Sequence, residues 1–152
     1  MRVSAKTDYA LRAALELARA GGDAPVKAER IAAAQDIPLR FLENILGELR
    51  HAGLVESRRG AEGGYMLARP APAIALADVV RAVDGPLANV GGRRPDALEY
   101  PEGAEALRDV WVAVRAGLRE VLEGTTLADV AAGSLPAQVA ALVEPEDAWQ
   151  PR

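Results

Sequence analysis

The stretch from residue 37 to residue 67 constrains the fold of this chain more than any other part of its sequence. Apolar side chains recur in its first half at intervals of three and four residues, which is the spacing of one side of an α-helix. These residues are Leu42, Ile45, Leu46 and Leu49. Pro38 suits the first turn of this helix and Gly53 suits its C-terminal end, so the pattern predicts a helix with one buried side between them.

A short hairpin is predicted directly after this helix, because residues 54–58 and 65–68 have the composition of two strands. The turn is basic and rich in glycine, with Arg58, Arg59, Gly60, Gly63 and Gly64. A helix followed by such a hairpin is typical of the recognition helix and wing of a winged-helix DNA-binding domain, since a major groove admits one α-helix. The alternative is an ordinary helix and hairpin whose arginines are solvated.

Two further helices are predicted before the central one, over residues 4–20 and 26–35. The second is joined to the central helix by a turn at residues 36–39, which matches the spacing of a helix-turn-helix unit. Lys6 and Tyr9 lie near the start of the first helix, where side chains and free backbone N–H groups can meet a phosphate. A place in the core suits Tyr9 equally well.

The charge is distributed unevenly along the chain, with a total of −4. Residues 1–70 hold 11 Lys and Arg and 9 Asp and Glu, while residues 71–152 hold 7 and 13. A mildly basic first half and an acidic second half fit a DNA-binding head on a body that stays away from DNA. The absence of cysteine excludes disulfides, thiolate metal sites and thiol redox chemistry.

Neither a membrane span nor an export signal is expected. No apolar run reaches the roughly 18 residues that a transmembrane helix needs. The N-terminus begins an amphipathic helix and not an apolar signal segment. A length of 152 residues suffices for one domain with appendages. We therefore expect a cytoplasmic protein with no membrane partner.

The second half of the chain predicts a loop followed by a long helix. Residues 74–84 form a last helix of the head, and residues 87–101 have no periodicity. Such a loop is often functional, and a plain linker is the alternative. Residues 102–122 predict the longest helix, with an apolar stripe suited to pairing between two chains or to packing within its own domain. The stripe contains Leu107, Val110, Val114, Leu118 and Val121.

These segments together resemble the IscR/NsrR/CymR family of bacterial winged-helix transcription regulators, also called Rrf-type. The resemblance covers about residues 1–130 and is most specific in the wing. It is carried by residues 1–11, 37–43, 52–55, 57–60, 63–67 and 76–86. It implies a homodimer crossed through its long helices, with two heads on double-stranded DNA at a pseudo-palindromic operator.

The resemblance also implies which residues meet DNA. Those implied at base edges are Arg40, Glu43 and Asn44, with Arg59 in the minor groove and Arg58 and Lys6 at the backbone. The chemistry agrees, because arginine suits guanine, glutamate accepts from cytosine, and a narrow minor groove attracts arginine. The full set expected at the DNA is Lys6, Tyr9, Pro38, Leu39, Arg40, Glu43, Asn44, Arg58, Arg59, Gly60, Gly63 and Gly64.

The main departure from the family concerns its cofactor. The best-known members hold an iron–sulfur cluster through three cysteines in the loop before the long helix, and residues 89–108 of this chain contain no cysteine. Such clusters are held chiefly by cysteine, so no cofactor is expected. His51 is the only histidine, which argues against structural zinc as well and leaves no expected metal site.

Two kinds of input stay open for a member without a cluster. A small anionic or planar molecule could bind between the loop and the long helix, with candidate contacts at Arg93, Arg94, Tyr100, Trp111 and Arg115. These residues could instead only stabilise the dimer, since surface arginines are commonly solvated. The other input is a partner protein, which analogy with the fold alone suggests.

The sequence thus predicts a mainly α fold with a small β-hairpin wing, in a winged helix-turn-helix head, followed by a long C-terminal dimerisation helix. The expected parts are a DNA-binding domain at 1–86, a sensor-type loop at 87–101, a dimerisation helix and short helix at 102–132, and a tail at 133–152. We expect a sequence-specific homodimeric repressor and not an enzyme, because no nucleophile–base pair or metal set is present. The alternative is a regulatory module that acts through a partner protein, with DNA binding weak or lost.

Overall fold

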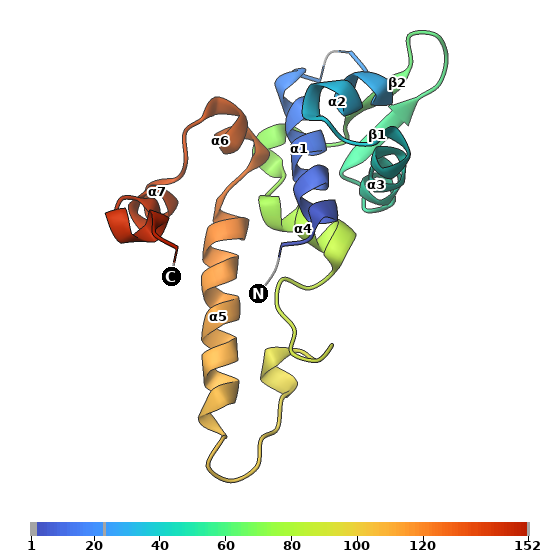
Figure 1. Ribbon diagram of the computed structural model, residues 1–152. Coiled ribbons are helices and arrows are strands. Elements are labelled where there is room, and N and C mark those ends of the chain that lie inside the picture. The colour runs from blue at the N-terminus through green and yellow to red at the C-terminus, as the bar shows by residue number, and fades with distance from the viewer. Residues whose placement is uncertain (1–2, 23, 152) are drawn as a thin grey trace.

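The structure, a computed structural model, describes residues 3–22 and 24–151. Residues 1, 2, 23 and 152, which fall in the predicted head and tail, lie outside this part. A helical head carries a hairpin, and a long helix projects away from the head (Figure 1). The elements are α1 (Ala5–Arg19), α2 (Ala28–Gln35), α3 (Leu39–His51), β1 (Val55–Arg58), β2 (Gly64–Leu67), α4 (Leu76–Asp84), α5 (Ala106–Gly124), α6 (Leu127–Ala132) and α7 (Ala137–Val143), with short 3-10 turns η1 (Ala71–Ala73), η2 (Pro95–Ala97) and η3 (Glu146–Trp149).

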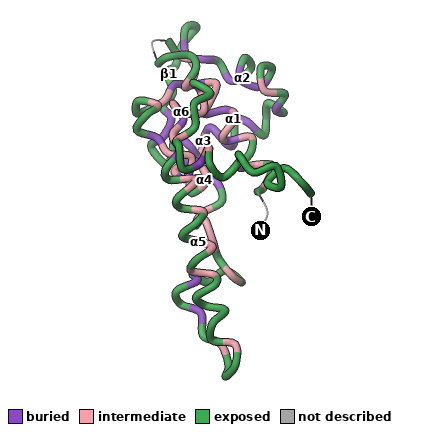
Figure 2. The backbone as a smooth tube through the Cα atoms, turned by 90° about the vertical axis from the view of Figure 1, so that its left-hand side faces the viewer, coloured by how far each residue is buried: buried purple, intermediate pink, exposed green. Residues whose placement is uncertain are grey.

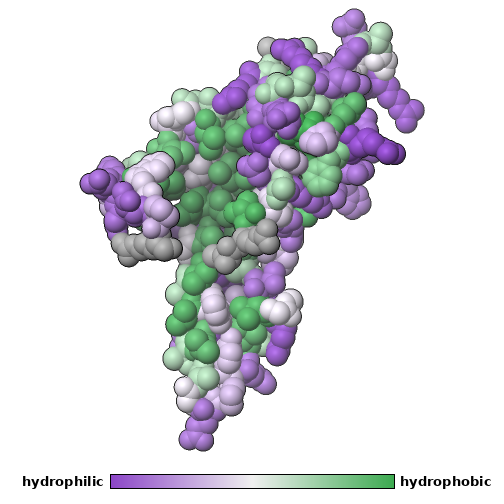
Figure 3. Space-filling model, viewed as in Figure 1, coloured by the Kyte–Doolittle hydropathy of each residue, from purple (hydrophilic) through white to green (hydrophobic). Residues whose placement is uncertain are grey.

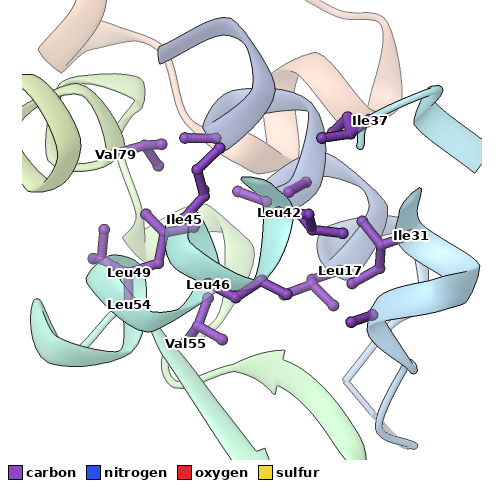
Figure 4. Close-up of a cluster of buried hydrophobic side chains, with 14 of the residues drawn as sticks. Leu17, Ile31, Ile37, Leu42, Ile45, Leu46, Leu49, Leu54, Val55 and Val79 are labelled. Carbon is purple, nitrogen blue, oxygen red and sulfur yellow. The ribbon is translucent and has the colours of Figure 1, made fainter. Parts of the chain in front are cut away.

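The core of the head forms around one side of α3. The four apolar residues predicted on that side are at most 1% exposed, which confirms the stripe. Leu17 of α1, Ile31 of α2 and Val79 of α4 pack around them (Figure 4). Full burial of such a side chain is worth about 1.5–3 kcal/mol, so this side of α3 cannot turn outward without a large loss of stability.

The hairpin is anchored to the head by a third stretch of backbone. β1 and β2 pair in antiparallel register, and Val26 pairs with Tyr65 of β2 through two hydrogen bonds of 2.8 Å. Because of this pairing, α2 begins at Ala28 and the predicted start at residue 26 is wrong. The backbone of the hairpin comes very close to Val26 at Gly64, where a Cβ would lie 2.5 Å from the Val26 carbonyl oxygen.

The loop before α5 is held against that helix by one carboxylate. Asp96 of η2 accepts a hydrogen bond of 2.8 Å from Arg94 and another from Arg115 of α5. Pro95 and Leu98, on either side of it, are buried. The hydrogen bond from Arg115 is the largest influence that lowers the pKa of Asp96 from 3.8 to about 2. The loop predicted without periodicity is therefore ordered by a specific contact.

α5 is the longest helix, as predicted, and it contains no buried residue. It starts at Ala106 and not at residue 102, because a turn over residues 101–104 precedes it. Figure 2 shows that burial is concentrated in the head and not along α5. On its predicted stripe, the exposed residues are Leu107 and Val110 (44% and 51%), and the half-buried ones are Val114, Leu118 and Val121.

The segment expected as a loose tail is partly helical. It contains α7, whose Val139 is buried, and the short turn η3. Within residues 3–22 and 24–151, no helix has the length and apolar character needed to cross a membrane.

Gly64→Ala should destabilise the protein by about 1–3 kcal/mol, because the added methyl group would collide with the backbone of Val26 at a φ of +153°. The matched control is Gly47→Ala, inside α3, where a Cβ meets nothing within 4 Å. That change should stabilise the protein by about 0.5–1 kcal/mol. Urea unfolding measures both. A Gly64→Ala protein as stable as the wild type would contradict the anchoring of the hairpin on Val26.

Ionised Asp96 should stabilise the protein only above acidic pH. Because its pKa in the folded chain lies below the ordinary value, its contribution is complete above about pH 5 and is lost as the pH falls from 3.8 towards about 2. The difference in unfolding free energy between wild type and Asp96→Asn should therefore be constant from neutral pH to about pH 5 and then shrink. Arg115→Met should raise the pKa of Asp96 in a carboxyl NMR titration. An unchanged pKa in that variant would refute the contact.

Candidate nucleic-acid interface

The side of α3 opposite its buried stripe carries polar side chains without partners. Arg40, Glu43 and Asn44 are exposed, and they form no hydrogen bond or ion pair with any residue in the described part of the chain. Their spacing of three and one residues keeps them together in the first half of the helix. Since the opposite side of α3 is fixed in the core, these donors and acceptors are held outward and remain available for another molecule.

The start of α3 is defined by the turn that follows α2. Asp36 ends α2 with a φ of +50°, and Ile37 is buried at 4% exposure, which fixes the direction of the turn. The Pro38 carbonyl accepts a hydrogen bond of 3.0 Å from the N–H of Phe41. Leu39 therefore opens the helix and is 37% exposed. A turn of this length between two helices is the geometry of a helix-turn-helix unit.

The tip of the hairpin is narrow and basic. Arg58 and Arg59 are exposed, and their side chains have no hydrogen-bond or ion-pair partner within residues 3–22 and 24–151. The N–H of Gly63 donates to the carbonyl of Gly60 at 3.0 Å. A Cβ on Gly63 would lie 2.2 Å from the Arg58 carbonyl oxygen, so glycine is required for the turn. The two arginines are thus presented on a tip that can approach DNA closely.

A further contact joins α3 to the hairpin. Arg50, in the last turn of α3, donates to the hydroxyl oxygen of Ser57 in β1 at 3.2 Å. This contact could not be predicted from the sequence, because a guanidinium–hydroxyl pair seven residues apart has no periodic signature. Together with the packing of Val26 on the hairpin, it fixes the wing relative to the outer side of α3.

The two predicted contacts on α1 already have partners within the protein. The Lys6 ammonium group lies 2.7 Å from a carboxylate oxygen of Glu48 on α3 and 3.0 Å from the Val83 carbonyl oxygen. Tyr9 packs edge to face on Phe41, with ring centroids 5.7 Å apart. Both residues support α3 from the side. Contacts of Lys6 or Tyr9 with a phosphate stay predictions.

The five residues predicted to contact a ligand near the loop do not line one common site. Arg94 and Arg115 are brought together, with Asp96 between them, and Arg93 donates to the Ala97 carbonyl at 2.8 Å. Trp111 is half-buried. Tyr100 lines a separate groove of about 260 Å³ with Leu98, Glu99, Glu105 and Arg108. Asp96, which pairs with two of the three arginines, could not be identified from the sequence.

This geometry matches that of known regulators. The family model Rrf2, described as an iron-dependent transcriptional regulator, matches residues 3–133. A protein of Mycobacterium tuberculosis named as the HTH-type transcriptional regulator Rv1287 is 54% identical over 144 residues, which cover 95% of this chain and 89% of that protein. The HTH-type transcriptional regulator CymR of Bacillus subtilis is 38% identical over 131 residues, which cover 86% of this chain and 90% of that protein.

Solved structures of two regulators have a similar fold. CymR, the global cysteine regulator of B. subtilis, superposes with a TM-score of 0.75 at 36% identity, covering 88% of this chain and 98% of that one. IscR of T. potens superposes with a TM-score of 0.71 at 34% identity, covering 88% of both chains. These similarities confirm the predicted winged-helix fold.

The residues present do not fit the iron that the family's description names. The chain has no cysteine, and thiolates are the chief ligands of iron–sulfur clusters. Within the described ranges, no group of three or more His, Asp or Glu side chains is placed to hold a metal ion.

The outer side of α3, the glycine-tipped wing and the relatives all point to the same class of protein. The match to the family model spans most of the chain. Two relatives are 54% and 38% identical to this chain over 89% and 90% of their own length. The chain belongs to the Rrf2 family and is a DNA-binding transcription regulator.

Proposed function

We propose that this regulator acts as a homodimer that represses transcription by binding a pseudo-palindromic operator, without catalysing a reaction. The observation that carries the proposal is the set Arg40, Glu43 and Asn44, which is exposed and unpaired within the described chain while the other side of α3 is buried. A repressor needs no further part, since a head that occupies a promoter excludes the polymerase from it.

The side chains on α3 suit the groups that base pairs offer in the major groove. Arginine donates to guanine, asparagine pairs with adenine, and glutamate accepts from cytosine. Leu39, exposed at the start of the helix, suits the methyl group of thymine. Arg59 at the wing tip suits a narrow minor groove, where the potential is most negative, and Arg58 suits the phosphate backbone. One head would therefore read one half-site.

The exposed surface of the chain supports a homodimer. The surface is 9578 Å² for a mass of 16.0 kDa, whereas a compact monomer of this mass exposes about 7,400 Å². The excess of about 2,200 Å² lies within the roughly 1,000–2,500 Å² that each partner of an obligate homodimer buries. The apolar stripe of α5, which its own chain covers only in part, is the surface that suits such pairing.

A small anionic molecule at the loop is the effector that these side chains suit. It would displace the Asp96 carboxylate from Arg94 and Arg115, with Arg93, Tyr100 and Trp111 nearby in sequence. Because Asp96 holds the loop on α5, its displacement would loosen the loop from α5, the helix proposed to form the dimer. A partner protein that contacts the same loop is the other candidate input.

Selection of bound duplexes from a random pool, with purified protein at a stated salt concentration, tests the proposed function. We expect a two-fold symmetric motif whose half-sites are centred about one turn of the duplex or more apart, because each head reads one half-site. A protein that enriches no motif, or only an asymmetric one, would contradict homodimeric operator binding.

Arg40→Ala and Arg59→Ala should each weaken binding to the selected duplex by about 1–3 kcal/mol, with a much smaller loss on random DNA. The reason is that both side chains would read groove features that differ between sequences. Arg108→Ala, which removes an exposed arginine from α5, is the matched control and should leave both affinities unchanged. Titrations of both duplexes at one salt concentration measure the effects. Equal losses on selected and random DNA would argue against these assignments.

A further inference from the structure

The C-terminal arm, residues 134–149, lies beyond the part that the family model matches, which ends at residue 133. Its helix α7 packs on α5, and Figure 1 shows the arm beside α5 on the side away from α4. Large apolar side chains of the arm are exposed. They are Leu135, Leu142, Val143 and Trp149, at 41%, 58%, 41% and 72%.

The apolar side of α7 is only half covered by its own chain. Val139 is 9% exposed, whereas Leu142 and Val143, three and four residues further on the same side of the helix, are largely uncovered. The indole N–H of Trp149 donates to the Val143 carbonyl at 2.7 Å and folds η3 back on α7. The arm therefore holds apolar groups in a defined position without burying them. Contiguous apolar surface of this kind marks an interaction site.

The uncovered side of α5 continues this apolar surface. Leu107 and Val110 are exposed near its start, and Leu118 and Leu122 line a cavity of about 400 Å³ further along. The head lines the same cavity with the apolar residues Val3, Leu11, Val80 and Pro86, and the loop that follows adds Leu87. Figure 3 shows hydrophobic side chains following α5 between the arm and the head. We call this surface the trough: α5 forms its floor, the head forms one wall, and the arm lies along the opposite side of α5.

We infer that the C-terminal arm forms part of the homodimer interface, by closing over α5 of the second copy when that helix lies in the trough. The inference rests on the homodimer proposed above and adds the arm to its interface. α5 is itself a helix whose apolar stripe is only partly covered, so a second copy supplies the shape and chemistry that the trough requires. The arm continues directly from the stripe assigned to the dimer, and an excess surface of about 2,200 Å² per chain is large enough for both.

Leu142→Glu in the full chain tests the role of the arm. The dimer dissociation constant, measured by sedimentation equilibrium, should rise about tenfold or more, because a buried leucine is lost from the interface. Ala141→Glu is the matched control: it adds the same charge to an exposed position on the opposite side of α7 and should leave the constant unchanged. If the wild type dimerises and Leu142→Glu dimerises equally well, the arm is not part of the interface and the homodimer stands. A wild type that stays monomeric would overturn the homodimer itself.

Tryptophan fluorescence supplies a second test that does not depend on an introduced charge. The chain has two tryptophans, so Trp111→Phe leaves Trp149 as the only one. Its emission should shift to shorter wavelength as the protein concentration is raised through the dimer dissociation constant, because an indole that is 72% exposed in one chain becomes covered. Emission that keeps the wavelength of an exposed indole while the mass doubles would show that the arm faces solvent or a different partner, and would overturn the inference.

Discussion

The burial of one side of α3 is the interaction on which the rest of the molecule depends. Leu42, Ile45, Leu46 and Leu49 occupy the centre of the head and are at most 1% exposed. Rotating the helix to expose them would cost several kcal/mol in total, at about 1.5–3 kcal/mol for each side chain. The same constraint decides which side chains point outward. The outward position of Arg40, Glu43 and Asn44 on α3 is thus a consequence of the core and needs no separate positioning device.

The wing depends on the head in a comparable way. A two-stranded hairpin is marginally stable alone in water, and this one gains a third stretch of backbone at Val26 and a side-chain contact between Arg50 and Ser57. The glycines allow both the close approach to Val26 and the tight tip. The recognition helix and the wing are therefore parts of one head, whereas α5 and the C-terminal arm carry large apolar side chains that stay exposed.

The features that could be predicted from the sequence are those set within a single element. The stripe of α3 follows from its own periodicity, and the glycine-tipped hairpin from its own composition. The pairing of Val26 with Tyr65 could not be predicted, because one paired residue leaves no pattern. Asp96 is one of 22 acidic residues and gains its role only when the loop brings it to Arg115. The contact of Lys6 with DNA is predicted from its place near the start of the first helix and from the family resemblance, whereas its pairing with Glu48 depends on how α1 crosses α3.

The central claim is that α3 and the wing tip together form the surface that meets DNA. Hydrogen–deuterium exchange of the full chain, with and without a selected duplex, tests it most directly. The account predicts slower exchange at residues 38–47 and 57–64 when DNA is bound, with exchange along α5 unchanged. Slower exchange confined to α5 or to the loop at 87–101, with α3 and the wing unaffected, would contradict it.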